Sequence, residues 1–394
     1  MSSEGSNIVL GVPRETHAGE TRVALVPAVI SILSKSGIRV VVERGAGASA
    51  GYTDAAYEEK GATLGSRDDV FAAQILACVR VAGANPGGDD KSRVRREQIV
   101  IGMADPLNEP EAVRDYAANG ATLFALELIP RITRGQSMDV LSSMATIAGY
   151  KAVLMAADTL PRMIPMMMTA AGTVAPARAF VVGAGVAGLQ AIASAKRMGA
   201  VVHAYDVRPA VKEQIQSLGG KFVELPVEAG DAEDKGGYAR ELGEDFYRRQ
   251  RELMARVVAE SDFVITTAAI PGKKAPILIT GDMLKAMAPG SVVVDLAAER
   301  GGNVDVTRAG ETVDVNGVKV IGPVNLAATV PYHASQMYAR NVTAFVQNFV
   351  KKGVINLSDE DEIVKGTMVT HGGDVVNPAL RERLGMAAAA KSGS

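Results

Sequence analysis

The stretch of sequence that decides the fold is Ala179-Phe180-Val181-Val182-Gly183-Ala184-Gly185-Val186-Ala187-Gly188. The apolar residues at its start predict a strand over Ala179 to Val182, and the segment from Val186 to Met198 predicts a helix. Three glycines in the spacing GxGxxG join these elements, and Asp206 follows roughly 20 residues beyond, at the end of the next apolar run. The first glycine permits a tight turn, the second leaves room for a ligand beside the backbone, and the third lets helix and strand pack closely.

This arrangement predicts a dinucleotide-binding site. The start of the helix offers unpaired N–H groups and the positive end of the helix dipole to a pyrophosphate. Asp206 is expected to accept hydrogen bonds from ribose hydroxyls and to repel a 2′-phosphate, which favours NAD(H) over NADP(H), although the nearby Arg208 weakens that preference. For the glycine motif, a turn that binds no nucleotide is the alternative.

Further contacts are expected from loops at the carboxyl ends of later strands, because ligands of such folds bind outside those ends. Each of these loops is also compatible with ordinary turn chemistry. The predicted cofactor-binding residues of the motif and these loops are Gly183, Gly185, Val186, Ala187, Gly188, Asp206, Val207, Arg208, Thr267, Ala268, Ala269, Leu296, Glu299 and Asn325.

The rest of the chain alternates short apolar runs with helix-compatible segments, which is typical of α/β proteins with parallel sheets. Two long helix-compatible segments, Met138 to Leu160 and Ser335 to Lys351, flank the nucleotide-binding region. We therefore expect two Rossmann-like, doubly wound parallel-sheet domains joined by two long helices. The predicted first domain comprises residues 1–137 and 330–394, and residues 138–329 form the NAD(H)-binding domain with the first bridging helix.

The composition excludes several classes of protein. The chain has 394 residues, 47% of them hydrophobic, and a net charge of −2, unlike a disordered chain or one with a basic surface for nucleic acid. One cysteine excludes a disulfide framework and a cysteine-based zinc site. No run of about 18 apolar residues lacks charge and proline, and the first residues lack the pattern of a signal peptide. We therefore expect a cytoplasmic protein without a membrane-spanning helix.

The histidines offer no obvious proton-transfer site. A dehydrogenase that acts on an alcohol or amine must move a proton with the hydride, usually through a positioned His, Lys or acid. His203 lies in a predicted strand, His17 and His333 are paired with no acid, and His371 lies near the C-terminus. No metal-ligand spacing is present, so no metal site is predicted. Hydride transfer between two nicotinamide rings needs only orientation, close approach and exclusion of water.

Several motifs resemble those of the alanine dehydrogenase and pyridine nucleotide transhydrogenase family, from about residue 7 to about residue 380. The resemblance points to the NAD(H)-binding domain I of proton-translocating transhydrogenases, made as a separate soluble subunit. The motifs are Gly11-Val12-Pro13-Arg14-Glu15, Arg22-Val23-Ala24-Leu25-Val26-Pro27, Leu128 to Asp139, Pro165 to Thr173, Gly183 to Gly199, Leu218-Gly219-Gly220-Lys221-Phe222, Gly236-Gly237-Tyr238-Ala239 and Ile270-Pro271-Gly272-Lys273.

The resemblance implies roles for a polar segment that precedes the first long helix. Arg131, Gln136 and Asp139 would belong to the loop that orients the dihydronicotinamide ring. Gln136 would reach toward the nicotinamide ribose, and Arg131 and Asp139 would form an ion pair that fixes the loop. Ser142 would lie beside the carboxamide. By composition alone, a polar interdomain turn is the alternative.

The resemblance also implies a mobile flap with Gly237 and Tyr238 that closes over bound nucleotide; by composition this segment is a surface loop. The implied activity is direct hydride transfer from NADH to NADP⁺ bound on a partner domain, coupled to proton translocation by membrane-spanning subunits. NADP(H) would not bind to this chain, which would be active only with its partners and peripheral to the inner face of the membrane. We also predict a homodimer, because the long Met- and Ala-rich helices would otherwise leave apolar patches exposed.

The sequence departs from the family pattern at two positions, and this departure distinguishes a transhydrogenase from an alanine dehydrogenase. Alanine dehydrogenases carry a lysine and a histidine at places that correspond to Arg80 and Ala104 here. Their absence disfavours the alternative function, an NAD-dependent alanine-type amino-acid dehydrogenase. A non-catalytic NAD(H)-responsive binding module is the third hypothesis, and substitution of Gln136 separates it from the first.

Overall fold

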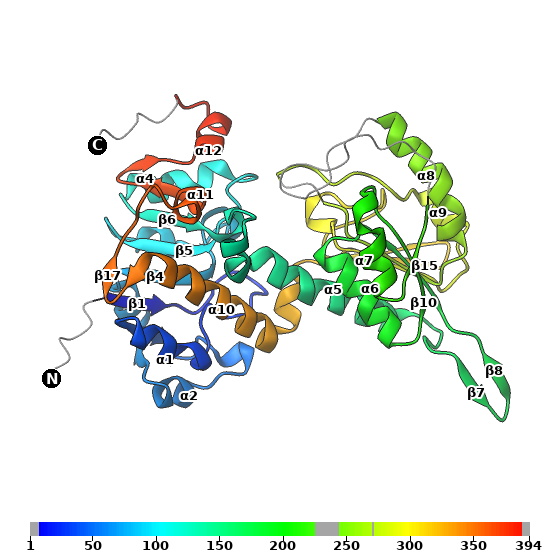
Figure 1. Cartoon of the computed structure of the whole chain (residues 1–394), viewed down its shortest axis with the longest axis horizontal. Coiled ribbons are helices and arrows are strands. Elements are labelled where there is room, and N and C mark those ends of the chain that lie inside the picture. Colours follow the sequence, from blue (N-terminus) through cyan, green and yellow to red (C-terminus); the bar gives the residue numbers. More distant parts are fainter. Residues whose placement is uncertain (1–7, 225–243, 270–271, 388–394) are drawn as a thin grey trace. The chain divides into compact units, whose positions relative to one another are not determined.

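The computed structural model describes residues 8–224, 244–269 and 272–387, and its contacts divide the chain into two compact units. Unit 1 comprises Met1–Met144 with Ala328–Ser394, and unit 2 comprises Ala145–Ala327. The chain leaves unit 1 within helix α5 (Val140–Thr159) and returns near the 3-10 segment Leu326–Thr329. The second predicted bridging helix, α10 (Pro331–Phe349), lies wholly in unit 1, because the chain returns before this helix begins (Figure 1).

Unit 1 is built on a sheet with the strand order β19-β18-β6-β5-β4-β1-β2-β3. The strands from β1 to β6 are parallel, whereas β18 and the edge strand β19 are antiparallel to their neighbours. Strands of a parallel sheet are apolar throughout because helices cover both faces. The strands of unit 1 are β1 (Ile8–Val12), β2 (Ile38–Glu43), β3 (Thr63–Gly65), β4 (Ile75–Arg80), β5 (Ile99–Met103), β6 (Thr122–Ala125), β18 (Met368–His371) and β19 (Asp374–Val375), with the hairpin β16 (Val350–Lys351) and β17 (Val354–Ile355).

Helix α10 packs on this sheet through aromatic side chains. The Phe345 and Phe349 rings lie 5.2 and 5.6 Å from the ring of Phe124 on β6, measured between centroids. These contacts explain why α10 belongs to unit 1. The other helices of unit 1 are α1 (Pro27–Lys35), α2 (Asp54–Glu59), α3 (Arg67–Phe71), α4 (Arg114–Ala118), α11 (Glu362–Thr367) and α12 (Pro378–Arg383).

Unit 2 is a second doubly wound sheet, with the order β11-β10-β9-β12-β13-β15-β14. All neighbouring pairs are parallel except the edge pair β14 and β15. Its strands are β9 (Arg178–Val182), β10 (Val201–Tyr205), β11 (Lys221–Phe222), β12 (Phe263–Thr266), β13 (Val292–Asp295), β14 (Thr312–Val315) and β15 (Val318–Ile321). Its helices, besides α5, are α6 (Val186–Arg197), α7 (Lys212–Ser217), α8 (Glu244–Ala259) and α9 (Gly281–Lys285). A hairpin of β7 (Met167–Thr169) and β8 (Gly172–Val174) projects from this unit (Figure 1).

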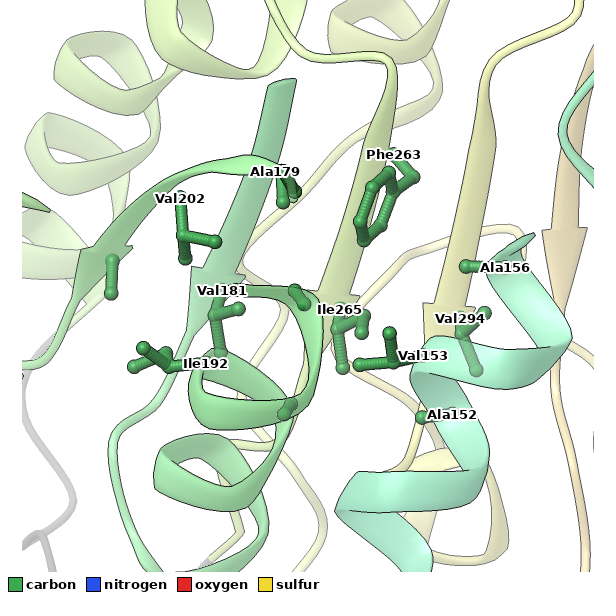
Figure 2. Close-up of a cluster of buried hydrophobic side chains, with 14 of the residues drawn as sticks. Ala152, Val153, Ala156, Ala179, Val181, Ile192, Val202, Phe263, Ile265 and Val294 are labelled. Carbon is green, nitrogen blue, oxygen red and sulfur yellow. The ribbon is translucent and has the colours of Figure 1, made fainter. Parts of the chain in front are cut away.

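The core of unit 2 forms where α5 and α6 pack on the sheet. Figure 2 shows Val181, Ile265 and Val294 on neighbouring strands, with Ile192 of α6 and Val153 of α5 against them. All five side chains are fully buried. The helices therefore hold the strand ends in fixed positions, which matters because the candidate site is built on those ends.

Helix α5 is long and apolar enough to cross a membrane by length and composition, among the residues that the structure describes. No such segment was expected, because no run of about 18 apolar residues is free of charge and proline, and α5 itself carries Lys151 and Asp158. Core helices of globular proteins meet the same length and composition criteria. Ala152, Val153 and Ala156 of α5 lie in the buried core of unit 2, and 33% of the apolar stretch is buried within the protein.

Candidate functional site

The ends of two adjacent strands, β9 and β12, form the centre of the candidate site in unit 2. The strands are parallel, with Val182 paired to Thr266. The order of the strands changes direction between them, and open α/β sheets bind their ligands at such a point. Gly183 follows β9 with a φ of +95°, and its N–H donates to the Tyr205 carbonyl at 2.8 Å. A Cβ here would lie 2.6 Å from Thr267 Oγ1, so this turn requires glycine.

The other two glycines of the motif have different surroundings. A Cβ at Gly188 would lie 1.9 Å from the Gly183 carbonyl oxygen, so close packing of α6 on the turn requires glycine there. A Cβ at Gly185 would meet no protein atom within 4 Å, and the φ of −73° at this residue suits any amino acid. The fold therefore does not require glycine at position 185. The open space beside its backbone fits a group that approaches closely, as a pyrophosphate does.

Helix α6 begins at this open space. Its N-cap residue is Gly185, which offers no side chain to the N–H groups of the first turn. Those groups and the helix dipole suit an anion. The residues that would hold the pyrophosphate of a dinucleotide are thus Gly183, Gly185 and the predicted Val186 and Ala187 at the start of α6.

Asp206, which follows β10, is bound within the protein on both oxygens. Its Oδ2 accepts hydrogen bonds from the Ala184 N–H at 2.7 Å and Arg208 Nη2 at 3.0 Å. Its Oδ1 accepts from the Arg208 N–H and Nε, both at 2.9 Å. Asp206 therefore holds the glycine loop in place, and Arg208 lies against this carboxylate. Val207, between them, packs partly buried against the core.

A second loop, after β12, contacts the first directly. Thr267 Oγ1 donates to the Gly183 carbonyl at 3.0 Å. The Ala268 N–H donates to Asn303 Oδ1 at 3.0 Å, and its carbonyl accepts from Asn303 Nδ2 at 2.8 Å. Asn303 engages both backbone groups of Ala268, and the next residue, Ala269, is exposed.

Asp295, at the end of β13, is the buried anchor of this loop. Its side chain is fully enclosed. It accepts hydrogen bonds from Thr266 Oγ1, the Ala297 N–H, the Asn303 N–H, the Val304 N–H and Thr307 Oγ1, at 2.7–3.1 Å. The loop that begins at Asp295 was expected at this edge of the sheet, but neither Asp295 nor Asn303 was predicted as an individual site residue. A carboxylate at the end of an apolar strand, followed by Gly301-Gly302-Asn303, is the signal that could have identified them.

The remaining predicted residues of unit 2 lie on loops at the same edge of the sheet. Leu296 is half-buried, and its N–H donates to the Thr266 carbonyl at 2.9 Å. Glu299 is exposed in the 3-10 segment Ala298–Arg300. Asn325 follows β15 with a φ of +46°. Gly237 and Tyr238, predicted for the flap, lie outside the described residues.

In unit 1, the predicted polar segment ends in a capped helix start. Asp139 caps α5: its Oδ1 accepts from the Ser142 N–H at 2.9 Å and its Oδ2 from Ser142 Oγ at 2.6 Å. The Asp139 carboxylate therefore orients Ser142. Arg131 and Gln136 are exposed on the same segment.

Two contacts that the sequence did not indicate fix this segment to unit 1, and a tight turn shapes it. Arg134 donates to both carboxylate oxygens of Asp361, at 2.8 and 3.1 Å. Asn341 Nδ2, on α10, donates to the Ser137 carbonyl at 2.8 Å. A Cβ at Gly135 would lie 2.5 Å from the Pro130 carbonyl oxygen. Gln136 thus projects from an anchored turn.

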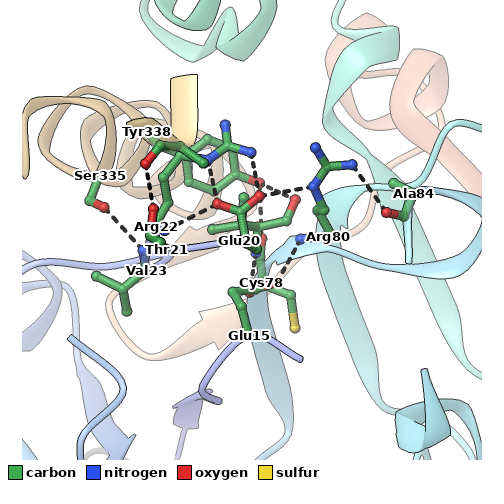
Figure 3. A network of polar contacts seen from close by, with 12 residues as sticks. Glu15, Glu20, Thr21, Arg22, Val23, Cys78, Arg80, Ala84, Ser335 and Tyr338 are labelled. Atoms are coloured by element: carbon green, nitrogen blue, oxygen red, sulfur yellow. Dashed lines mark hydrogen bonds and ion pairs between the residues drawn. The ribbon is translucent and has the colours of Figure 1, made fainter. Parts of the chain in front are cut away.

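A buried ionic network lies beside the carboxyl end of β4, near the point where the strand order of unit 1 changes direction (Figure 3). Glu20 accepts hydrogen bonds from Arg22 Nε and Nη2, at 2.7 and 2.6 Å, and from Arg80 Nε at 2.9 Å. Burial alone raises the pKa of Glu20, but the hydrogen bonds and charge of Arg22, with the hydrogen bond from Arg80, outweigh it and lower the pKa to about 2. Glu20 is therefore a permanent anion between two guanidinium groups.

The positions where alanine dehydrogenases carry lysine and histidine offer no proton-transfer group. The Arg80 side chain donates to Glu20 and, through Nη1, to the Ala84 carbonyl at 3.2 Å. Ala104 is buried, and its N–H donates to Glu127 Oε1 at 2.8 Å. Among the residues of known placement, no three His, Cys, Asp or Glu side chains are grouped to hold a metal ion.

Comparison with known proteins agrees with this architecture. Residues 11–148 match the family described as Alanine dehydrogenase/PNT, N-terminal domain, and residues 152–378 match its C-terminal domain. The first part of the NAD(P) transhydrogenase alpha subunit of Rhodospirillum rubrum is 45% identical over 381 residues, covering 94% of this chain and 98% of that protein. The crystal structure of transhydrogenase from Sinorhizobium meliloti matches with a TM-score of 0.84 and 46% identity, covering 93% of this chain and 100% of that one.

A more distant relative is alanine dehydrogenase of Bacillus subtilis, 28% identical over 392 residues, covering 96% of this chain and 95% of that protein. The doubly wound sheets, the glycine turn at the end of β9 and the matches over both units lead to one conclusion: the chain belongs to the alanine dehydrogenase/PNT family.

Proposed function

We propose that this chain is the NAD(H)-binding component of a proton-translocating NAD(P) transhydrogenase. It binds NADH in unit 2 and positions the nicotinamide for hydride transfer to NADP⁺ held by a partner domain. Membrane-spanning subunits couple this transfer to proton movement, and the chain lies on the cytoplasmic face through those partners. The names of its similar relatives, which are alpha subunits of transhydrogenases, support this assignment.

The observation that carries the binding proposal is the open space at Gly185. The protein leaves room there that its own packing does not require, at the start of α6 and beside the ends of β9 and β12. The carboxylate of Asp206 next to this loop disfavours a 2′-phosphate, and Arg208 is already paired with it. We therefore propose NAD(H) on this chain and NADP(H) on the partner. Calorimetric titration should give tighter binding of NADH than of NADPH, and the reverse order would contradict the assignment.

In unit 1, we propose that the anchored turn around Gln136 meets the partner and the nicotinamide end of the cofactor. Gln136 reaches the nicotinamide ribose, Ser142 lies beside the carboxamide, and Arg131 and Asp139 stabilise the loop. The bound nicotinamide supplies the hydride, and these side chains orient it. The flap that carries Gly237 and Tyr238 excludes water when nucleotide is bound.

The test is reconstitution with an NADP(H)-binding transhydrogenase domain. NADH should reduce NADP⁺ only when both proteins are present, and Gln136→Ala should slow this transfer while NADH binding persists. Unchanged transfer in Gln136→Ala would instead favour a role of Gln136 outside the reaction. Reduction of pyruvate with ammonia by the chain alone would favour the alanine-type dehydrogenase.

We further propose that the chain is a homodimer. In unit 2, Tyr150 on α5 and Met163 and Met166 on the adjoining segment are exposed apolar side chains that a second copy can cover. Sedimentation at micromolar concentration should give a dimer, and a monomer would contradict this proposal.

A further inference from the structure

Asn303 is a buried residue next to the candidate nucleotide site. Its side chain binds both the N–H and the carbonyl of one site residue, Ala268, as the backbone of a neighbouring strand does. Its side-chain amide accepts from the Ala268 N–H at 3.0 Å and donates to the Ala268 carbonyl at 2.8 Å. Nδ2 also donates to the Pro276 carbonyl at 2.9 Å. The side chain is completely buried, so each of these bonds replaces water that cannot enter.

The backbone of Asn303 is equally constrained. Its N–H donates to Asp295 Oδ2 at 2.7 Å, and its carbonyl accepts from the N–H groups of Leu278 and Ile279 at 2.8 and 3.0 Å. Asp295 in turn binds Thr266 Oγ1 at the end of β12. The amide of Asn303 is therefore a rigid reference point for the loop after β12.

That loop sets the geometry of the glycine turn. Thr267, next to Ala268, donates to the Gly183 carbonyl at 3.0 Å. The Thr267 side chain lies very close to the glycine turn, because a Cβ on Gly183 would lie 2.6 Å from Thr267 Oγ1. A shift of Ala268 away from Asn303 would move Thr267 and with it the turn that leads to Gly185.

We propose that Asn303 is a positioning residue for the nucleotide site: its amide holds Ala268 and Thr267 against Gly183 and thereby sets the affinity for NADH. The proposal rests on the NAD(H)-binding aspect of the proposed function and requires neither the partner domain nor hydride transfer. Asn303 itself contacts only protein in this role.

The test compares Asn303→Asp with Thr307→Val in the full-length chain. Aspartate retains an acceptor for the Ala268 N–H but cannot donate to the Ala268 and Pro276 carbonyls, and its charge faces both. Thr307→Val removes a different hydrogen bond to the same Asp295 oxygen, at 2.7 Å, and leaves the amide of Asn303 to bind Ala268 directly. We expect Asn303→Asp to raise the Kd for NADH roughly tenfold and Thr307→Val to leave it within about twofold, with both variants less heat-stable.

Asn303→Ser, which adds no charge, provides the same comparison where the aspartate variant does not fold. If Asn303 had only a general structural role, the Kd for NADH would rise as the Tm falls in all three variants. If Asn303 positions the site, the Kd should rise in the Asn303 variants alone. Equal Kd values for Asn303 and Thr307 variants of similar Tm would overturn the positioning role only. A wild-type chain that does not bind NADH would overturn the proposed function as well.

Discussion

At the scale of single residues, two glycines of one motif have separable functions. Gly188 is required by the protein, because any side chain would collide with the Gly183 carbonyl. Gly185 is not required by the protein, because the space beside it is open. The GxGxxG spacing in the sequence predicted both positions, but it did not distinguish the glycine needed for folding from the glycine available to a ligand.

Substitution of Gly185 and Gly188 by alanine, one at a time, should separate effects on the free energy of unfolding from effects on NADH binding. Gly185→Ala should lower the free energy of unfolding by no more than about 1 kcal/mol, because alanine is a poorer N-cap than glycine, and should weaken NADH binding, since the methyl group fills the ligand's space. Gly188→Ala should lower the free energy of unfolding by about 1–3 kcal/mol. Denaturant unfolding and calorimetric titration measure both quantities, and a strongly destabilised Gly185→Ala would contradict the assignment.

A buried carboxyl group in unit 1 makes stability depend on pH. Burial raises the pKa of Glu15 from 4.5 to about 8, against the lowering effect of hydrogen bonds from the Val79 and Arg80 N–H groups. The folded state therefore retains a proton that the unfolded chain releases. This contribution to stability is complete below about pH 4.5 and is lost as the pH rises through the folded pKa near 8, by on the order of a few kcal/mol.

Glu15→Gln should therefore flatten the fall in unfolding free energy between about pH 5 and pH 8. Glu127 contributes in the same direction, because burial raises its pKa to about 7, so some of the slope should persist. Denaturant titrations at a series of pH values measure the slope. Parallel profiles for the variant and the wild type would show that Glu15 does not titrate in this range.

At the scale of elements, helix α5 contacts the nucleotide-binding helix through a glycine. A Cβ at Gly149 would lie 2.1 Å from the Ala187 carbonyl oxygen and 3.0 Å from Ala187 Cα, both backbone atoms in the first turn of α6. Backbone atoms cannot rotate away as a side chain can. Close contact between the two helices therefore depends on this glycine.

Gly149→Ala should lower the free energy of unfolding by about 1–3 kcal/mol, although alanine favours a helix. Gly281→Ala is the matched control, since Gly281 also lies in a helix of unit 2 and its nearest neighbour would be 3.6 Å away. The control should be neutral or slightly stabilising. If Gly149→Ala were as stable as the control, the close contact between α5 and α6 would be of no energetic importance.

The elements that the sequence predicted are those with a continuous apolar run. The strand over Ala179 to Val182 and the helix over Val186 to Met198 were predicted to within one residue of their observed bounds. The antiparallel edge strand β14 was missed, because Thr312 and Asp314 are exposed and the run is interrupted. Asp295 and Asn303 were missed as site residues because their function depends on hydrogen bonds to backbone groups distant in the sequence.

At the scale of the whole molecule, two doubly wound units of one chain differ in what occupies the point where the strand order changes direction. In unit 2 the glycine turn leaves open space for a ligand. In unit 1 the corresponding region contains the protein's own Glu20, held by Arg22 and Arg80. We therefore expect the chain to bind its dinucleotide in unit 2.

The measurement that tests the central claim most directly is isotope transfer in a mixture of this chain and an NADP(H)-binding transhydrogenase domain. With NADH deuterated at the transferred position of the nicotinamide, the account predicts that the NADPH formed carries the deuterium and that none passes to water. NADPH without the label would contradict direct transfer, and conversion of pyruvate and ammonia to labelled alanine by this chain alone would identify it as a dehydrogenase instead.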